Sequence, residues 1–109
     1  MTSGFLDDKF YEELAEFCKG QANPKRLKIL HLLSDGEKTV GEISKMLGIP
    51  QANISQHLGY MRRAGVVKAR RVGSTVYYSV ADSRISEACG LISQVVADRI
   101  GITVREEAR

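Results

Sequence analysis

The sequence contains no tryptophan, only two prolines and only two cysteines among its 109 residues. Two cysteines are too few for the disulfide framework that stabilises many small secreted domains. No apolar stretch approaches the roughly 18 residues of a membrane-spanning helix. The N-terminus has neither the basic start nor the long apolar run of a signal peptide. We therefore expect a cytoplasmic protein that has no membrane partner.

The chain is short, which excludes the larger enzyme folds. A length of 109 residues is insufficient for a barrel enzyme or for a two-domain enzyme that binds a dinucleotide. The hydrophobic fraction of 43% is in the range of ordinary globular proteins. No internal repeat or interdomain linker divides the chain, so we expect residues 1–109 to form a single domain.

Charge is distributed unevenly along the chain. Residues 1–23 and 81–109 carry a small excess of acidic side chains, whereas residues 24–80 carry ten Lys or Arg against three Asp or Glu. No acidic residue occurs between Glu42 and Asp82. A basic centre without carboxylates favours contact with a polyanion, because a carboxylate placed against phosphate would repel it.

Hydrophobic periodicity predicts a mainly α fold. Apolar and β-branched patterns predict five helices over about 7–19, 24–33, 39–47, 51–64 and 82–100, and two strands over 66–72 and 75–80. Gly20 and the pair Asn23-Pro24 are expected to end the first helix and begin the second. Thr39 stands three residues before Glu42, which is the spacing of a capping box.

The order of these elements predicts a winged helix-turn-helix domain, with the arrangement α-α-α-α-β-β-α. The short helix 39–47, the turn 48–50 and the longer helix 51–64 match the helix-turn-helix unit, in which the longer helix enters the major groove of DNA. The two strands meet at Gly73-Ser74 and form a hairpin rich in Lys and Arg, which serves as the wing.

The helical wheel of residues 51–64 separates an apolar side from a polar side. Ile54, Leu58 and Met61 gather on the apolar side. The opposite side carries amides, hydroxyls and small residues near its start, which suit base edges, and arginines near its end, which suit phosphate. The candidate DNA-binding residues on this helix and on the wing are Gln51, Ala52, Asn53, Ser55, Gln56, Tyr60, Arg62, Arg63, Arg70, Arg71, Ser74 and Thr75.

Four segments resemble the ArsR/SmtB family of winged-helix repressors. They are ANPKRLKIL at 22–30, ISQHL at 54–58, RAGVV at 63–67 and YYSV at 77–80, and the resemblance extends over about residues 8–100. It implies a homodimer that sits on a palindromic operator in double-stranded DNA and is released by an inducer. The resemblance also implies how the domain is organised. The dimerisation helices lie in residues 1–20 and 82–100, and the DNA-binding core with its wing lies in residues 24–80.

The metal sites of that family are expected to be absent. The resemblance places its thiolate pair at Thr39 and Gly41, which cannot supply thiolates. It places a zinc or nickel site at the start of the last helix, where Asp82 matches the first ligand but Arg84 stands in the position of a histidine. The two histidines of the chain, His31 and His57, are expected to be packed side chains. We therefore predict no metal and no cofactor.

Cys18 and Cys89 remain as candidate sensing groups, one late in the first helix and one early in the last. One interpretation makes them small buried hydrophobic residues, as free cysteines commonly are. The other makes them a thiol switch that forms a disulfide or polysulfide bridge within or between protomers. A thiolate site for a soft metal or metalloid is a further alternative, which we do not favour.

Three other functions compete with a sequence-specific repressor. A sequence-tolerant DNA-coating protein would use the same basic face but would show little preference for one palindrome over random duplex. A winged helix can also serve as a protein-interaction module, which the missing carboxylates argue against. An enzyme is least favoured, because the sequence shows no nucleophile with a base, phosphate-binding glycine loop or metal triad.

Overall fold

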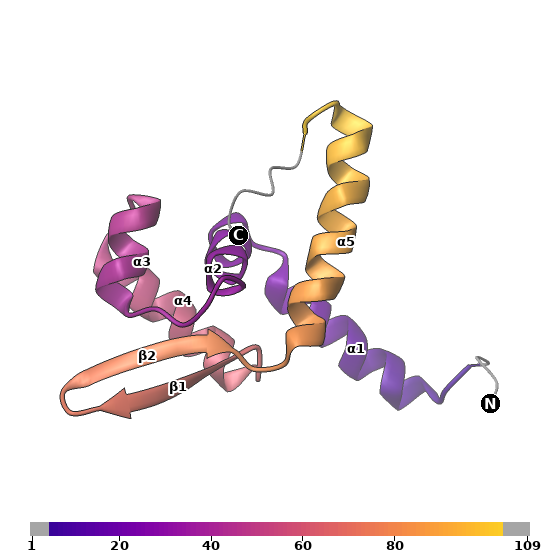
Figure 1. The fold of residues 1–109 in the computed structure, drawn as a ribbon. Helices are drawn as coiled ribbons and strands as arrows, with labels where there is room; N and C mark the ends of the chain where they lie inside the picture. Colours follow the sequence, from indigo (N-terminus) through magenta and orange to yellow (C-terminus); the bar gives the residue numbers. More distant parts are fainter. Residues whose placement is uncertain (1–4, 104–109) are drawn as a thin grey trace.

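The computed structural model describes residues 5–103 and contains five helices and one antiparallel hairpin. Figure 1 shows α3, α4 and the hairpin on one side of the molecule, α1 and α5 on the other, and α2 between them. The elements are α1 (Asp8–Gln21), α2 (Pro24–Leu33), α3 (Val40–Leu47), α4 (Gln51–Arg63), β1 (Val67–Val72), β2 (Thr75–Val80) and α5 (Ser83–Ile100). This order confirms the predicted winged helix-turn-helix fold.

The hydrophobic core lies where α2, α3, α4 and the start of β1 meet. Ile29 and Ile43 bring α2 and α3 into it, and both are fully buried. The apolar stripe of α4 completes it, together with Val66 just before the hairpin. Burial of side chains of this size is the main favourable contribution to folding. The core therefore holds α3 and α4 in one fixed arrangement.

The capping residues predicted from the sequence begin the helices where they were expected. Asn23 caps α2, since its side-chain oxygen accepts hydrogen bonds from the backbone N–H of Lys25 at 3.0 Å and of Arg26 at 3.1 Å. Thr39 and Glu42 form the capping box of α3: each side chain accepts a hydrogen bond from the backbone N–H of the other. These bonds satisfy amides that a helix start leaves without partners.

Gly20 does not end α1 as the sequence suggested; the helix continues to Gln21. Gly20 is buried, and a Cβ atom at this position would lie 2.5 Å from the Tyr60 hydroxyl oxygen. The glycine thus permits a close approach between α1 and α4. It does so while its own backbone stays helical. The helix ends at Ala22, whose backbone N–H donates to the carbonyl of Lys19.

The hairpin is extended by a third chain segment. β1 and β2 pair from Val67 opposite Val80 to Val72 opposite Thr75, and Gly73 begins the tight turn with φ of 62°. On the other edge of β2, Lys38 forms an isolated antiparallel bridge with Tyr78. β2 is consequently the middle strand, and the segment before α3 is fixed to the wing.

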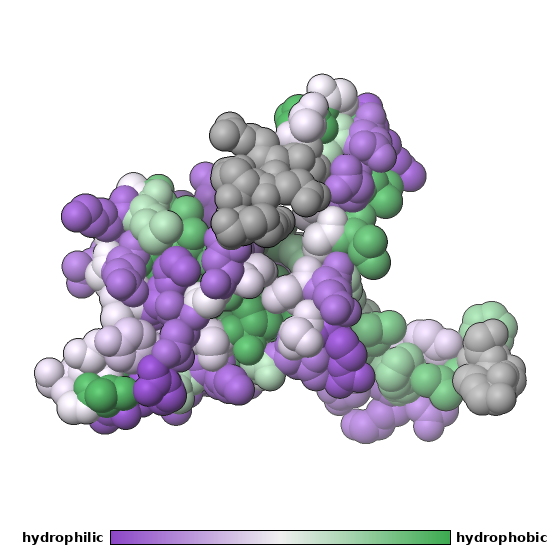
Figure 2. Space-filling view, viewed as in Figure 1, coloured by the Kyte–Doolittle hydropathy of each residue, from purple (hydrophilic) through white to green (hydrophobic). Residues whose placement is uncertain are grey.

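The outer helices leave much apolar surface uncovered. Leu91 and Ile92 on α5 are 71% and 65% exposed, and Phe10 and Leu14 on α1 are exposed as well. Figure 2 shows hydrophobic side chains gathered over these two helices. Over the described residues, no helix has the length and apolar character needed to cross a bilayer. Contiguous exposed apolar side chains of this kind commonly mark a protein contact surface.

We predict that Thr39→Ala lowers the free energy of unfolding by about 1 kcal/mol, because it removes the side-chain acceptor at the start of α3. Urea denaturation at a fixed protein concentration measures the change. Thr39→Ser keeps the hydroxyl group and is expected to remain within about 0.3 kcal/mol of the wild type. Equal losses in both variants would contradict the role of the capping bond.

Candidate nucleic-acid interface

The core decides which face of α4 is exposed. Ile54, Leu58 and Met61 have no exposed surface, so the helix cannot rotate without uncovering them. The opposite face is therefore presented to solvent. It carries exposed Gln51, Ala52, Ser55, Gln56, Arg62 and Arg63, with Asn53 half-buried at its margin.

The exposed face of α4 is polar at one end and cationic at the other. Its first turn carries no acidic residue, and its last turn carries Arg62 and Arg63. Among residues 5–103, neither arginine takes part in an ion pair. Their guanidinium groups are therefore available for phosphate, which they bind with up to five donors each. The amides and hydroxyls nearer the N-terminus are of the types that read base edges.

The wing supplies a second cationic surface. Arg71 and Ser74 are exposed near its tip, and Thr75 is half-buried. Arg71 shares a face of the hairpin with Val76, its cross-strand partner, whereas Arg70 is on the opposite face beside Tyr77. Within the described part of the chain, Arg71 forms no ion pair. It is therefore free to approach a DNA backbone.

Arg70 differs from Arg62, Arg63 and Arg71 because it is paired with a carboxylate. Its guanidinium group donates two hydrogen bonds to Glu37, one of them from Nε at 3.3 Å, and its Cζ lies 5.1 Å from the ring centroid of Tyr77. The hydrogen bond and charge of Arg70 lower the pKa of Glu37, and Glu37 in turn raises the pKa of Arg70. Both groups are therefore charged at neutral pH.

The pairing of Glu37 with Arg70 does not follow from the distribution of carboxylates along the chain. Glu37 precedes the acid-free stretch, but the bridge between Lys38 and Tyr78 brings it to the wing. The alternation of a strand then places it on the same face as Tyr77 and Arg70. The cationic surface is thus interrupted at one point. Only the pairing of the segment before α3 with β2 reveals this contact.

Tyr60 is half-buried and contacts two other helices. Its ring packs against the hydrophobic core and lies under Arg26, whose Cζ is 3.9 Å from the ring centroid. Its hydroxyl group lies beside Gly20. Tyr60 is one of the DNA-binding residues expected from the sequence. In the structure its contacts are with Arg26 of α2 and Gly20 of α1.

The two histidines have different surroundings. His57 is half-buried beside the apolar stripe of α4, and burial lowers its pKa, with further lowering from the charges of Arg26 and Lys25. It is therefore a neutral packed side chain at pH 7.

His31 is exposed, so the expectation that it would be packed is wrong. It occupies the outer side of α2, since Leu30 and Leu33 form the inner side.

At the start of α5, the Asp82 carboxylate is hydrogen-bonded to Arg84. Asp82 caps the helix, and Arg84 donates to it from its backbone N–H at 2.9 Å, from Nε at 3.0 Å and from Nη2 at 2.7 Å. These hydrogen bonds lower the pKa of Asp82 to about 2. Over residues 5–103, no three His, Cys, Asp or Glu side chains come together as a metal site.

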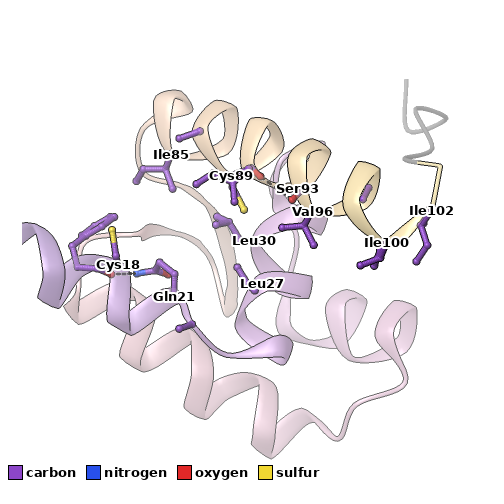
Figure 3. Close-up of a pocket in the computed structure, with 15 residues that line it drawn as sticks. Cys18, Gln21, Leu27, Leu30, Ile85, Cys89, Ser93, Val96, Ile100 and Ile102 are labelled. Carbon is purple, nitrogen blue, oxygen red and sulfur yellow. Dashed lines mark hydrogen bonds between the residues drawn. The ribbon is translucent and has the colours of Figure 1, made fainter.

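The two thiols line one cavity. Cys18 on α1 and Cys89 on α5 face the space between α1, α2 and α5, which has a volume of about 640 Å³ (Figure 3). Its walls are mainly apolar, and Gln21 and Ser93 add polar groups. In the single chain Cys18 is exposed and Cys89 is half-buried. Over residues 5–103 neither cysteine forms a disulfide.

Comparison with known proteins decides the family. Residues 23–69 match the family described as bacterial regulatory protein, arsR family. Rv0081 of Mycobacterium tuberculosis, an HTH-type transcriptional regulator, is 41% identical over 100 residues, which cover 87% of this chain and 88% of Rv0081. The chain belongs to the arsR family. This ArsR-family protein is therefore a DNA-binding transcriptional regulator and not an enzyme.

Two solved structures extend the comparison. The winged helix-turn-helix domain of Mb0332 from Mycobacterium bovis, described as homodimeric, has a TM-score of 0.78 at 29% identity and covers 97% of this chain and 100% of that one. The transcriptional repressor BigR from Xylella fastidiosa has a TM-score of 0.73 at 30% identity, with coverage of 81% and 90%. The ArsR-family protein thus shares its fold with regulators over most of its length.

We predict that Glu37→Gln increases DNA affinity severalfold, because it removes the carboxylate that competes with phosphate for Arg70. The slope of log affinity against log salt should become steeper by about one unit, as expected for one additional phosphate contact. Fluorescence anisotropy with a duplex selected from a random pool measures both quantities. Glu87→Gln on α5 changes the net charge equally but is remote from the wing, so an equal gain there would contradict the prediction.

Proposed function

We propose that the protein is a homodimeric, sequence-specific repressor that binds a palindromic operator through α4 and the wing. The observation that carries this proposal is the exposed face of α4, which has no carboxylate and presents amides, hydroxyls and two arginines that form no ion pair within residues 5–103. A solvated helix without a nucleic-acid partner more often alternates Glu and Lys. The distribution of side chains is therefore that of a surface built for a polyanion.

The roles of the residues follow from their places on α4. Ala52, Asn53 and Gln56 face base edges in the major groove, and Gln51 and Ser55 lie near the groove edge. Arg62 and Arg63 contact phosphate near the end of the helix.

The wing makes the remaining contacts with DNA. Its residues lie along the DNA backbone or enter the minor groove, and they are Arg71, Ser74 and Thr75. Arg70 joins them when its guanidinium group leaves Glu37.

A second copy of the chain covers the apolar faces of α1 and α5. These helices expose large hydrophobic side chains that a soluble protein seldom leaves in water. The description of Mb0332 as homodimeric supports the same assembly. Two-fold symmetry then places the two α4 helices about 34 Å apart, one turn of DNA, on a palindrome.

The direction of regulation is repression, as the description of BigR as a repressor supports. The signal that relieves it acts on Cys18 and Cys89, which face one cavity beside the dimerisation helices. An oxidant such as a peroxide takes two electrons and two protons from the thiols and is reduced to water, while a disulfide forms. The new bond would change the angle between protomers and the spacing of the recognition helices.

We predict opposite signatures for two substitutions on α4. Gln56→Ala should relax the preference for the operator, whereas Arg63→Ala should weaken binding to all sequences together and reduce the salt slope by about one unit. Competition binding with operator and random duplex at several salt concentrations measures both effects. If the two variants behave alike, the assignment of the faces is wrong.

Affinity for random duplex distinguishes a sequence-specific repressor from the alternative, a sequence-tolerant DNA-coating protein. A repressor is expected to favour its operator by about 10³-fold or more at fixed salt. A ratio near one for the wild type would favour a DNA-coating protein with no sequence preference. In a reporter strain, deletion of a repressor should raise transcription from the operator-bearing promoter, and a fall would show activation instead.

We predict that operator affinity falls at least about tenfold when the thiols are oxidised, which corresponds to an allosteric coupling of ordinary size. The experiment compares the operator affinity of reduced protein with that of protein treated with peroxide, polysulfide or a soft metal ion. Cys18→Ser and Cys89→Ser should each abolish the response while leaving reduced binding intact. Unchanged affinity in every arm would leave the cysteines as packing residues.

A further inference from the structure

Helix α1 is attached to the rest of the domain through its last turn. Of its residues Asp8–Gln21, all within the described part of the chain, only Gly20 is buried. Most of the helix projects away from the core, as Figure 1 shows. The position of α1 is therefore fixed mainly by what Gly20 and its neighbours contact.

Three residues from three helices meet at that point. Arg26 of α2 donates a hydrogen bond from Nη1 to the carbonyl oxygen of Gly20 at 2.8 Å. The Cζ atom of the same guanidinium group lies 3.9 Å from the ring centroid of Tyr60 on α4. Tyr60 in turn contacts Gly20, where a Cβ atom would approach the hydroxyl oxygen to 2.5 Å. The contacts close a triangle between α1, α2 and α4.

Each residue type has a physical reason to be at its position. A side chain at residue 20 would collide with the Tyr60 ring, so the approach of α1 to α4 needs glycine. A guanidinium group can donate to a carbonyl and lie over an aromatic ring at the same time, which an ammonium group does less well. Arg26 Nε is buried with no hydrogen-bond partner among the described residues. The arginine is thus held where the ring and the carbonyl require it.

Tyr60 lies on the helix that carries the DNA-facing residues. It is one turn beyond Gln56, about 6 Å along the axis, and three residues before Arg63. A change in the contact between α1 and Tyr60 therefore changes the position of that face relative to α1. Because α1 belongs to the dimer interface of the proposed function, a contact between α1 and α4 links that interface to the recognition helix.

We propose that Gly20, Arg26 and Tyr60 form a junction that sets the orientation of α4 relative to α1, and so the spacing of half-sites that the dimer accepts. The three residues are positioning residues and do not contact DNA. The inference rests on the proposed function, in which α1 joins the protomers and α4 enters the groove. It assigns to this junction the selection of operators by half-site spacing.

The experiment measures spacing preference. The wild-type protein first selects an operator from a pool of random duplexes, and the spacer between its half-sites is then lengthened and shortened by one base pair. The wild type should lose about tenfold or more in affinity at each altered spacing, since the half-sites move away from the fixed positions of the helices. Gly20→Ala and Arg26→Gln should reduce this loss to about threefold or less.

The slope of log affinity against log salt distinguishes residues that position α4 from residues that contact DNA. Because the junction residues do not touch phosphate, all variants should keep the wild-type slope. A slope reduced by about one unit in Arg26→Gln would show that Arg26 itself binds DNA and would overturn the inference. Lys25→Gln is the matched control: it removes one exposed charge from the adjacent position of α2 and should leave both spacing preference and slope unchanged.

Variants of Tyr60 make the test independent of Gly20→Ala, which could fail to fold. Tyr60→Phe retains the ring beneath Arg26 and should keep the preference, whereas Tyr60→Leu removes the ring and should relax it. Thermal unfolding and sedimentation confirm that each variant is a folded dimer. If the folded variants keep the wild-type spacing preference, the junction has no positioning role; if the wild type selects no duplex at all, the proposed function fails and this inference with it.

Discussion

The burial of one side of α4 is the constraint on which the rest of the molecule depends. Ile54, Leu58 and Met61 are wholly enclosed by α2, α3 and the start of the hairpin. Protein interiors are close-packed, so a rotation of α4 would open cavities and expose all three side chains at once. Hydrophobic packing alone therefore determines which amides and arginines are presented for recognition. The face of α4 that meets solvent is a consequence of how the core is filled.

Much of this arrangement could be predicted from the sequence because its determinants are local. The apolar period of α4, the capping residues Asn23 and Thr39 and the turn at Gly73 depend on residues within a few positions of one another. Such signals specify the type and order of the elements. They also specify which residues of α4 are exposed, since a helical wheel needs no knowledge of the partners.

The features that escaped prediction depend on residues far apart in the chain. Glu37 meets Arg70 only because the segment before α3 pairs with β2. Tyr60 turns inward only because Gly20 leaves room for its ring. Gly20 itself gave a misleading signal, since a glycine near a helix end usually indicates termination. In each case the sequence gives the residue types, and tertiary contacts decide what they do.

The bridge at Lys38 makes β2 the central strand and leaves β1 with an open edge. A strand edge with unsatisfied backbone groups can pair with the edge of another molecule and so begin aggregation. The cations of β1 oppose this, because like charges on two approaching edges repel each other. The wing thus gains solubility from the same side chains that it offers to nucleic acid. A DNA-binding regulator with a neutral wing would be prone to edge-to-edge association even before its affinity for DNA was considered.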